Sequence, residues 1–254
     1  MKIARFLKDG VLFDSNHFNE FLQKYLGWIT FLEAYEKTGW ILNINVSSSH
    51  GNDVPRLLNY MTSPNVIIWS AVSASCAIPQ VFEPVELLCK DSRGEIIPYT
   101  ITKNHRFIDG SVSADLPMQR ISELFNVNTF IVSQVNPFVI PFLSDDGGGI
   151  LGTNTAFSRK LRTLFNSELL HIVNLMSFFG LAPEKVERVA GIASQSYKGH
   201  VTISPKVRIN DYIHLLRNPT PEYIEDACKL SQHNTYPKIR LIKSIYEIER
   251  EIEN

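Results

Sequence analysis

Cysteine is scarce in this chain, which has three, at positions 76, 89 and 228. An odd number of widely spaced cysteines provides no disulfide framework and favours a reducing, intracellular setting. The histidines show no paired ligand spacing, so we expect no bound metal. A phosphate-binding Lys loop and a dinucleotide fingerprint are also missing, and the sequence therefore implies no cofactor.

An excess of charge of one sign is missing as well, because 25 Lys and Arg face 26 Asp and Glu, a net charge of −1. Without a basic stripe, we expect no nucleic-acid partner. The longest charge-free run, residues 57–82, contains Pro, Asn and Ser, so it predicts buried core and not a transmembrane helix. The N-terminus carries charges where a signal peptide needs its apolar core, and we expect a protein that is not secreted.

What is present is an ordinary globular composition of 254 residues, 44% of them hydrophobic, enough for a sizeable core. An amphipathic pattern predicts a helix over 15–26. Thr30 and Glu33 have the spacing of a capping box, which predicts a second helix that ends at Gly39. Isoleucines and valines in 40–47 then predict a strand.

The middle of the chain alternates strand and helix patterns. The expected elements are a strand over 66–69, a helix over 70–77, a strand over 106–109, a helix over 116–125 and a strand over 129–135. Residues 83–105 are expected to be irregular, with one turn near Arg93. The last three elements predict a right-handed, parallel βαβ unit. This alternation favours an α/β fold with an open, mainly parallel sheet flanked by helices.

Later in the chain the pattern changes. We divide the sequence into a sheet-bearing part (1–143), a glycine-rich connection (144–155) and a mostly helical C-terminal extension (156–254). Within the extension, Pro221 and Pro237 stand where helices are expected to begin.

An acid followed by glycine ends the strand expected over 106–109, in Asp109-Gly110-Ser111. Open α/β sheets bind ligands at the carboxyl ends of their strands, which makes Asp109 a candidate catalytic carboxylate. Asp-Gly is also a common turn, in which Gly110 supplies a positive φ and Asp109 caps the turn. The residues alone leave both interpretations open.

A carboxylate of this kind needs a nucleophile as its partner. A nucleophile elbow requires Gly-x-Ser-x-Gly, and the chain contains none. The nearest imitation is Ser73, which has no flanking glycines and which we interpret as a closely packed helix residue. His105 precedes Asp109 by four residues, and we interpret it as a surface residue in preference to a member of a triad.

Two further segments have a functional and a structural interpretation. Glycines in 146–152 can present backbone N–H groups to an oxyanion, but no strand runs into them, and we favour a linker. Residues 169–183 are apolar, include Phe178 and Phe179, and follow basic residues at 159–162. Such a helix can lie in a lipid interface, although burial is the commoner reason for this composition.

Several of these segments together resemble a known family. The matching segments are 30–35, 41–44, 55–60, 64–79, 107–111, 115–117 and 125–137, with weaker matches at 199–203 and 218–220. They are similar to the patatin-like lipid acyl hydrolases, and most of all to the triacylglycerol lipases of yeasts and plant seeds. The resemblance implies the patatin-like α/β fold.

The resemblance also implies a chemistry, in which a Ser-Asp dyad hydrolyses lipid esters. Asp109 matches the aspartate and would be the general base, with Gly110 and Ser111 completing its turn. The serine and the oxyanion glycines precede the aspartate in this family, further upstream than this sequence reaches. We therefore expect neither a nucleophile nor an oxyanion hole within residues 1–254, and no hydrolase activity from the chain alone.

The expected function is that of a lipid acyl ester hydrolase of the triacylglycerol lipase kind, acting on neutral lipid or phospholipid. We expect it in the cytoplasm or peripherally on a lipid droplet or membrane. Two alternatives stay open: a non-catalytic protein that binds a lipid droplet or membrane surface, and an acyl transferase of the same fold.

Overall fold

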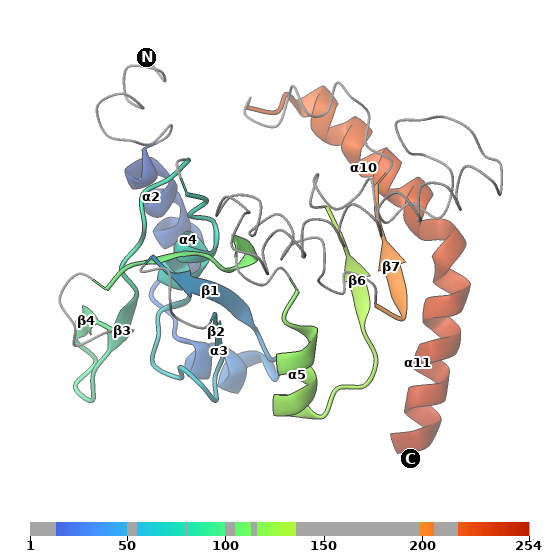
Figure 1. Ribbon diagram of the computed structural model, residues 1–254, viewed down its shortest axis with the longest axis horizontal. Coiled ribbons are helices and arrows are strands. Elements are labelled where there is room, and N and C mark those ends of the chain that lie inside the picture. Colours follow the sequence, from blue (N-terminus) through green and yellow to red (C-terminus); the bar gives the residue numbers. More distant parts are fainter. Residues whose placement is uncertain are drawn as a thin grey trace, which may run out of the picture. The chain divides into compact units, whose positions relative to one another are not determined.

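A computed structural model describes residues 14–49, 55–79, 81–99, 105–112, 116–135, 199–205 and 218–253 (Figure 1). It divides the chain into two compact units, Met1–Arg120 and Ile121–Asn254. The connection expected over 144–155 lies outside the described residues.

The described part of the first unit begins with two helices whose ends agree with the sequence prediction. Helix α2 (Ser15–Leu26) starts after Asp14, whose side chain accepts a hydrogen bond from the backbone of the second helical residue, and stops at Gly27, where φ is 66°. Helix α3 (Phe31–Thr38) starts with the expected capping box and ends at Gly39, where φ is 71°. Both glycines adopt the positive φ that side chains disfavour at a helix end.

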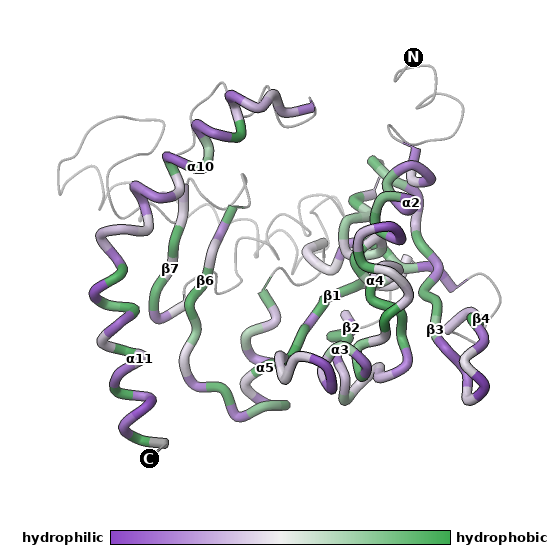
Figure 2. Tube along the Cα trace, turned by 180° about the vertical axis from the view of Figure 1, so that it is seen from behind, coloured by the Kyte–Doolittle hydropathy of each residue, from purple (hydrophilic) through white to green (hydrophobic). Residues whose placement is uncertain are grey.

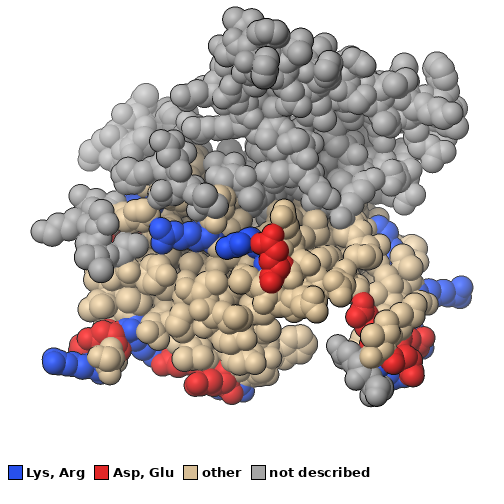
Figure 3. Space-filling model, turned by 60° about the horizontal axis from the view of Figure 1, so that its bottom comes forward, with Lys and Arg blue, Asp and Glu red and all other residues tan. Residues whose placement is uncertain are grey.

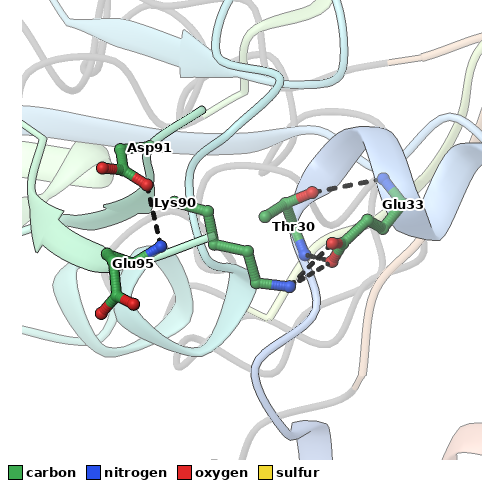
Figure 4. A network of polar contacts seen from close by, with 5 residues as sticks. All are labelled: Thr30, Glu33, Lys90, Asp91 and Glu95. Atoms are coloured by element: carbon green, nitrogen blue, oxygen red, sulfur yellow. Dashed lines mark hydrogen bonds and ion pairs between the residues drawn. The ribbon is translucent and has the colours of Figure 1, made fainter. Parts of the chain in front are cut away.

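The capping box also connects α3 to a β-hairpin. Thr30 N–H donates to Glu33 (2.9 Å), and the ammonium of Lys90 lies 2.7 and 2.8 Å from the two oxygens of the same carboxylate (Figure 4). Burial, the largest single influence, acts to raise the pKa of Glu33. The hydrogen bonds from Lys90 and Thr30 outweigh it together and hold the pKa below its ordinary value.

Lys90 belongs to the hairpin of β3 (Leu88–Lys90) and β4 (Ile96–Pro98), which pair antiparallel. In its turn, Asp91 Oδ1 accepts hydrogen bonds from two backbone N–H groups, both at 2.8 Å (the second, from Glu95, is drawn in Figure 4), and Gly94 has a φ of 83°. The predicted turn is therefore confirmed. The expectation of an otherwise irregular segment was wrong, because strands of three residues are too short to show an alternating pattern.

The central sheet of the first unit has the order β2 (Arg56–Leu58), β1 (Ile44–Ser48), β5 (Phe107–Asp109), and both pairs are antiparallel. Val46 and Phe107 are fully buried in its core. Helix α4 (Ile68–Ser75) packs against β1 and α2 and completes this core.

Residues 66–69 do not form the strand that the sequence predicts. Val66 and Ile67 make single bridges to Cys89 and Thr30, and the helix already begins at Ile68. The carbonyl of Ile67 accepts hydrogen bonds from the backbone and the hydroxyl of Ser70, which turns the chain into the helix. A short apolar run indicates burial and cannot by itself distinguish a buried strand from a buried helix.

Helix α5 (Met118–Phe125) crosses from the first unit into the second. There, β6 (Ile131–Ser133) pairs in parallel with β7 (Val201–Ile203). The α/β class is confirmed, but the βαβ prediction was wrong: β5 pairs with β1, and β6 pairs with a strand about 70 residues later in sequence. Hydrophobic patterns identify strands without identifying their partners.

The second unit ends with α10 (Pro221–Thr235), the 3₁₀ turn η2 (Tyr236–Lys238) and α11 (Ile239–Glu253). Pro221 occupies the first position of α10 as predicted. Pro237 lies in the 3₁₀ turn and not at the start of the last helix. Among the described residues, no helix is long and apolar enough to cross a membrane. On the face drawn in Figure 3, the charges of described residues are mixed in sign.

Candidate active site

Strand β5, which ends at Asp109, is hydrogen-bonded to other segments along both of its edges. On one side it pairs with β1, where Asp109 lies opposite Val46. On the other side, Phe107 exchanges two backbone hydrogen bonds with Val85, at 2.8 and 2.7 Å. The position of Asp109 is therefore determined by strand pairing on both edges of β5.

The backbone and the side chain of Asp109 are both engaged. Its N–H donates to the carbonyl of Ala77 (3.1 Å), the residue after the C-cap of α4. Its Oδ1 accepts a hydrogen bond from Ser111 N–H (2.9 Å), within the 3₁₀ turn Gly110–Val112. The side chain is half-buried. The turn interpretation of Asp-Gly is confirmed in this respect, and the same bond gives the carboxylate a defined direction.

Gly110 is needed for space and not for its dihedral angle. The sequence predicted a positive φ, which Gly110 does not adopt. A Cβ added there would lie 2.6 Å from the backbone carbon and 2.6 Å from the backbone oxygen of Asn45, and 2.8 Å from its Cγ. Real Cβ atoms essentially never come this close to another heavy atom. Only glycine allows the turn after Asp109 to lie this tightly against β1.

Cys76 is electrostatically coupled to Asp109. Desolvation is the larger cause that raises the pKa of its thiol, and the carboxylate of Asp109 is the second, because a neighbouring negative charge disfavours the thiolate. The residue as a whole keeps an exposed surface. A raised pKa lowers the fraction of Cys76 that is thiolate, the nucleophilic form of the side chain, at neutral pH.

Ser73 and His105, the two candidate partners in the sequence, make packing contacts. Ser73 is buried within α4, and its hydroxyl donates to Asn19 Oδ1 on α2 (2.5 Å). The interpretation of Ser73 as a closely packed helix residue is confirmed. His105 is half-buried, with its ring centroid 4.8 Å from that of Phe107, so it is more enclosed than the expected surface residue.

Other candidates lie outside the described residues, namely the glycine run 146–152 and the apolar segment 169–183 with Phe178 and Phe179. Within the part of the chain that the structure describes, no three His, Cys, Asp or Glu side chains gather as metal ligands.

Sequence reasoning missed Asn45 and Cys76. Asn45 lies in a strand about 60 residues before Asp109, and Cys76 is one of several small residues in a run. Neither lies in the Asp109-Gly110-Ser111 motif, because contact between distant segments leaves no local signal. The requirement for glycine at position 110 is the nearest hint, since a glycine after a strand often marks a close approach.

The fold and this site define an α/β protein with a fixed carboxylate at a strand end. Residues 2–121 match a family model described as patatin-like phospholipase. Asp109 with its turn lies within the residues that match this family.

Several triacylglycerol lipases are similar to nearly the whole chain. Triacylglycerol lipase 4 of Saccharomyces cerevisiae is 40% identical over 257 residues, which cover 96% of this chain and 28% of the relative. Triacylglycerol lipase SDP1L of Arabidopsis thaliana is 38% identical (97% of this chain, 32% of the relative). Triacylglycerol lipase ptl3 of Schizosaccharomyces pombe is 32% identical (97% and 51%). This chain thus spans only about a third of the length of the first two.

Proposed function

We propose that this chain contributes the general base, Asp109, to a lipid acyl ester hydrolase whose nucleophilic serine lies outside residues 1–254. The observation that carries the proposal is the fixed carboxylate at the end of β5, inside the segment that the patatin-like model matches. The names of the relatives support triacylglycerol as the substrate.

In the proposed reaction, Asp109 accepts the proton of the serine hydroxyl while the serine oxygen attacks the acyl carbonyl. The bond to the alcohol then breaks, and the aspartic acid returns the proton to the departing alcohol. Water hydrolyses the acyl-serine by the same two proton transfers and releases the fatty acid. No histidine is required, in keeping with the contact of His105 with Phe107.

The surroundings of Asp109 suit this role. A general base works best when its oxygens are already oriented, and the bond from Ser111 N–H holds one of them. The bond from Asp109 N–H to Ala77 fixes the backbone from which the carboxylate projects. The proposed base therefore does not depend on an ordering step when substrate binds.

A chimera tests the proposal. In triacylglycerol lipase 4 of S. cerevisiae, this chain replaces the stretch that it matches over 257 residues. We expect the chimera to hydrolyse triacylglycerol and Asp109→Asn to lower kcat by roughly 10³-fold, the usual contribution of a general base.

Asp91→Asn is the matched control, because Asp91 also accepts backbone N–H bonds in a turn, yet lies in the β3–β4 hairpin. It should leave kcat unchanged. An Asp109→Asn chimera that keeps its activity would refute the role of the base. Ester hydrolysis by the isolated chain would instead refute a serine outside it.

A further inference from the structure

One side of α11 is anchored within its own unit. Glu249 accepts a hydrogen bond from the hydroxyl of Thr129, and Lys238, at the end of the preceding 3₁₀ turn, donates to the carbonyl of Thr202 in β7. At about 100° per residue, Lys238 and Glu249 lie on nearly the same side of the helix. The helix is therefore formed and oriented before it meets any partner.

A second side of α11 carries an exposed apolar stripe. Leu241, Ile248 and Ile252 are 50%, 60% and 76% exposed, and the half-buried Ile245 completes the row. Successive spacings of four, three and four residues are those of a coiled-coil seam, in which such side chains pack against a second helix. Figure 2 shows the apolar and polar residues alternating along α11.

The charges beside this stripe are arranged asymmetrically. Arg240 at the start of the helix and Glu251 near its end are both exposed and lie on the same flank of the stripe, about 20° apart around the axis. In a pair of antiparallel helices related by a two-fold axis, the same flanks face each other. Arg240 of each copy would then lie beside Glu251 of the other, whereas a parallel pair would turn this flank toward the opposite flank of the partner, and the two residues would not meet.

We propose that α11 is a self-association surface, through which two copies of this chain pair antiparallel along Leu241, Ile248 and Ile252. The charge arrangement selects a second copy as the occupant, since one helix supplies both complementary ends. A helix of 15 residues is only about 22 Å long, so the contact is small and its affinity is in the micromolar range. Because α11 is already anchored, association does not have to order it first.

Sedimentation velocity on the full chain over a micromolar concentration series tests this pairing. The mass should rise from monomer to dimer with concentration, and Ile248→Glu should raise the dissociation constant by at least about tenfold. Tyr246→Glu is the control, because Tyr246 is 63% exposed but lies about 140° around the helix from Leu241. A monomer at every concentration, or a dimer that Ile248→Glu leaves intact, would overturn the proposal.

A charge exchange tests the direction of the two helices. Arg240→Glu and Glu251→Lys should each weaken the dimer several-fold, and the variant with both changes should restore it. Failure of the double variant to restore the dimer would overturn the antiparallel arrangement. Glu251 also lies 3.5 Å from Arg250 in the same helix, so circular dichroism and thermal unfolding establish that each variant keeps its fold.

Discussion

Substituting alanine for Gly110 probes the tightest approach in the candidate site. The new Cβ would lie 2.6 Å from two backbone atoms of Asn45, which is 0.8 Å short of the 3.4 Å where ordinary contact begins. Backbone atoms cannot rotate away, so β1 and the turn after β5 must separate. Overpacking of a core costs about 1–3 kcal/mol, and we expect the upper part of this range, about 2–3 kcal/mol.

Thermal unfolding measures this cost. In a domain of this size, 1 kcal/mol lowers Tm by about 4 °C, so Gly110→Ala should lower the Tm of the first unit by roughly 8–12 °C. Gly94→Ala is the comparison, because it introduces backbone strain without a steric clash: Gly94 has a φ of 83°, and no heavy atom lies within 4 Å of the added Cβ. We expect about 1 kcal/mol there, or roughly 4 °C.

Combining Gly110→Ala with Asn45→Ala tests whether the added Cβ clashes with the backbone of Asn45 or with its side chain. Asn45→Ala removes the Cγ at 2.8 Å but leaves the backbone carbon and oxygen in place. It should not rescue Gly110→Ala, and the coupling between the two substitutions should stay below about 0.5 kcal/mol. The reasoning is refuted if Gly110→Ala unfolds at the temperature of the wild type, or if Asn45→Ala restores its stability.

Two further predictions follow from the pKa shifts. Asp109→Asn removes a negative charge near the Cys76 thiol, so the pKa of the thiol should fall. The pH dependence of its alkylation by iodoacetamide, measured by peptide mass spectrometry, should then shift to lower pH. An unchanged pH dependence would contradict the electrostatic coupling. Glu33→Gln removes the charge that pairs with Lys90 and should lower Tm at pH 7 by roughly 2 °C, an exposed-pair effect of about 0.5 kcal/mol. Because the folded pKa of Glu33 is lowered, this difference is complete above the unfolded pKa of about 4.3 and disappears as pH falls through the folded pKa; a pH-independent difference would contradict the assignment.

The helices were the most predictable part of the first unit, for a local reason. The ends of α3 are encoded by Thr30, Glu33 and Gly39, whose effects act within a single turn of helix. A capping box and a C-terminal glycine can be recognised without knowing what the helix packs against. The same is true of Asp14 at the start of α2.

The strands and the surroundings of the site were less predictable, because both depend on distant segments. An apolar run at 66–69 indicates burial, but the bond from Ser70 to Ile67 decides for a helix. Asp109 and its turn were recognisable as a motif, whereas the nearness of Asn45 and Cys76 depends on how β1 and α4 pack. The predicted positive φ of Gly110 was wrong for the same reason. Local turn statistics favour a positive φ, but the glycine is required because β1, a distant strand, leaves no room for a side chain.

The backbone hydrogen bond from Asp109 N–H to the carbonyl of Ala77 makes the opening of the candidate site measurable. Its amide proton is protected through contacts that join segments 20 to 60 residues apart, at β1, Val85 and the end of α4. The proton exchanges with solvent only in molecules in which the bond to Ala77 is broken, so its protection measures the free energy of separating β5 from the end of α4. Hydrogen exchange at this one amide therefore reports the fraction of molecules in which the backbone that carries the carboxylate has separated from the end of α4, and in that fraction the proposed base is not correctly placed.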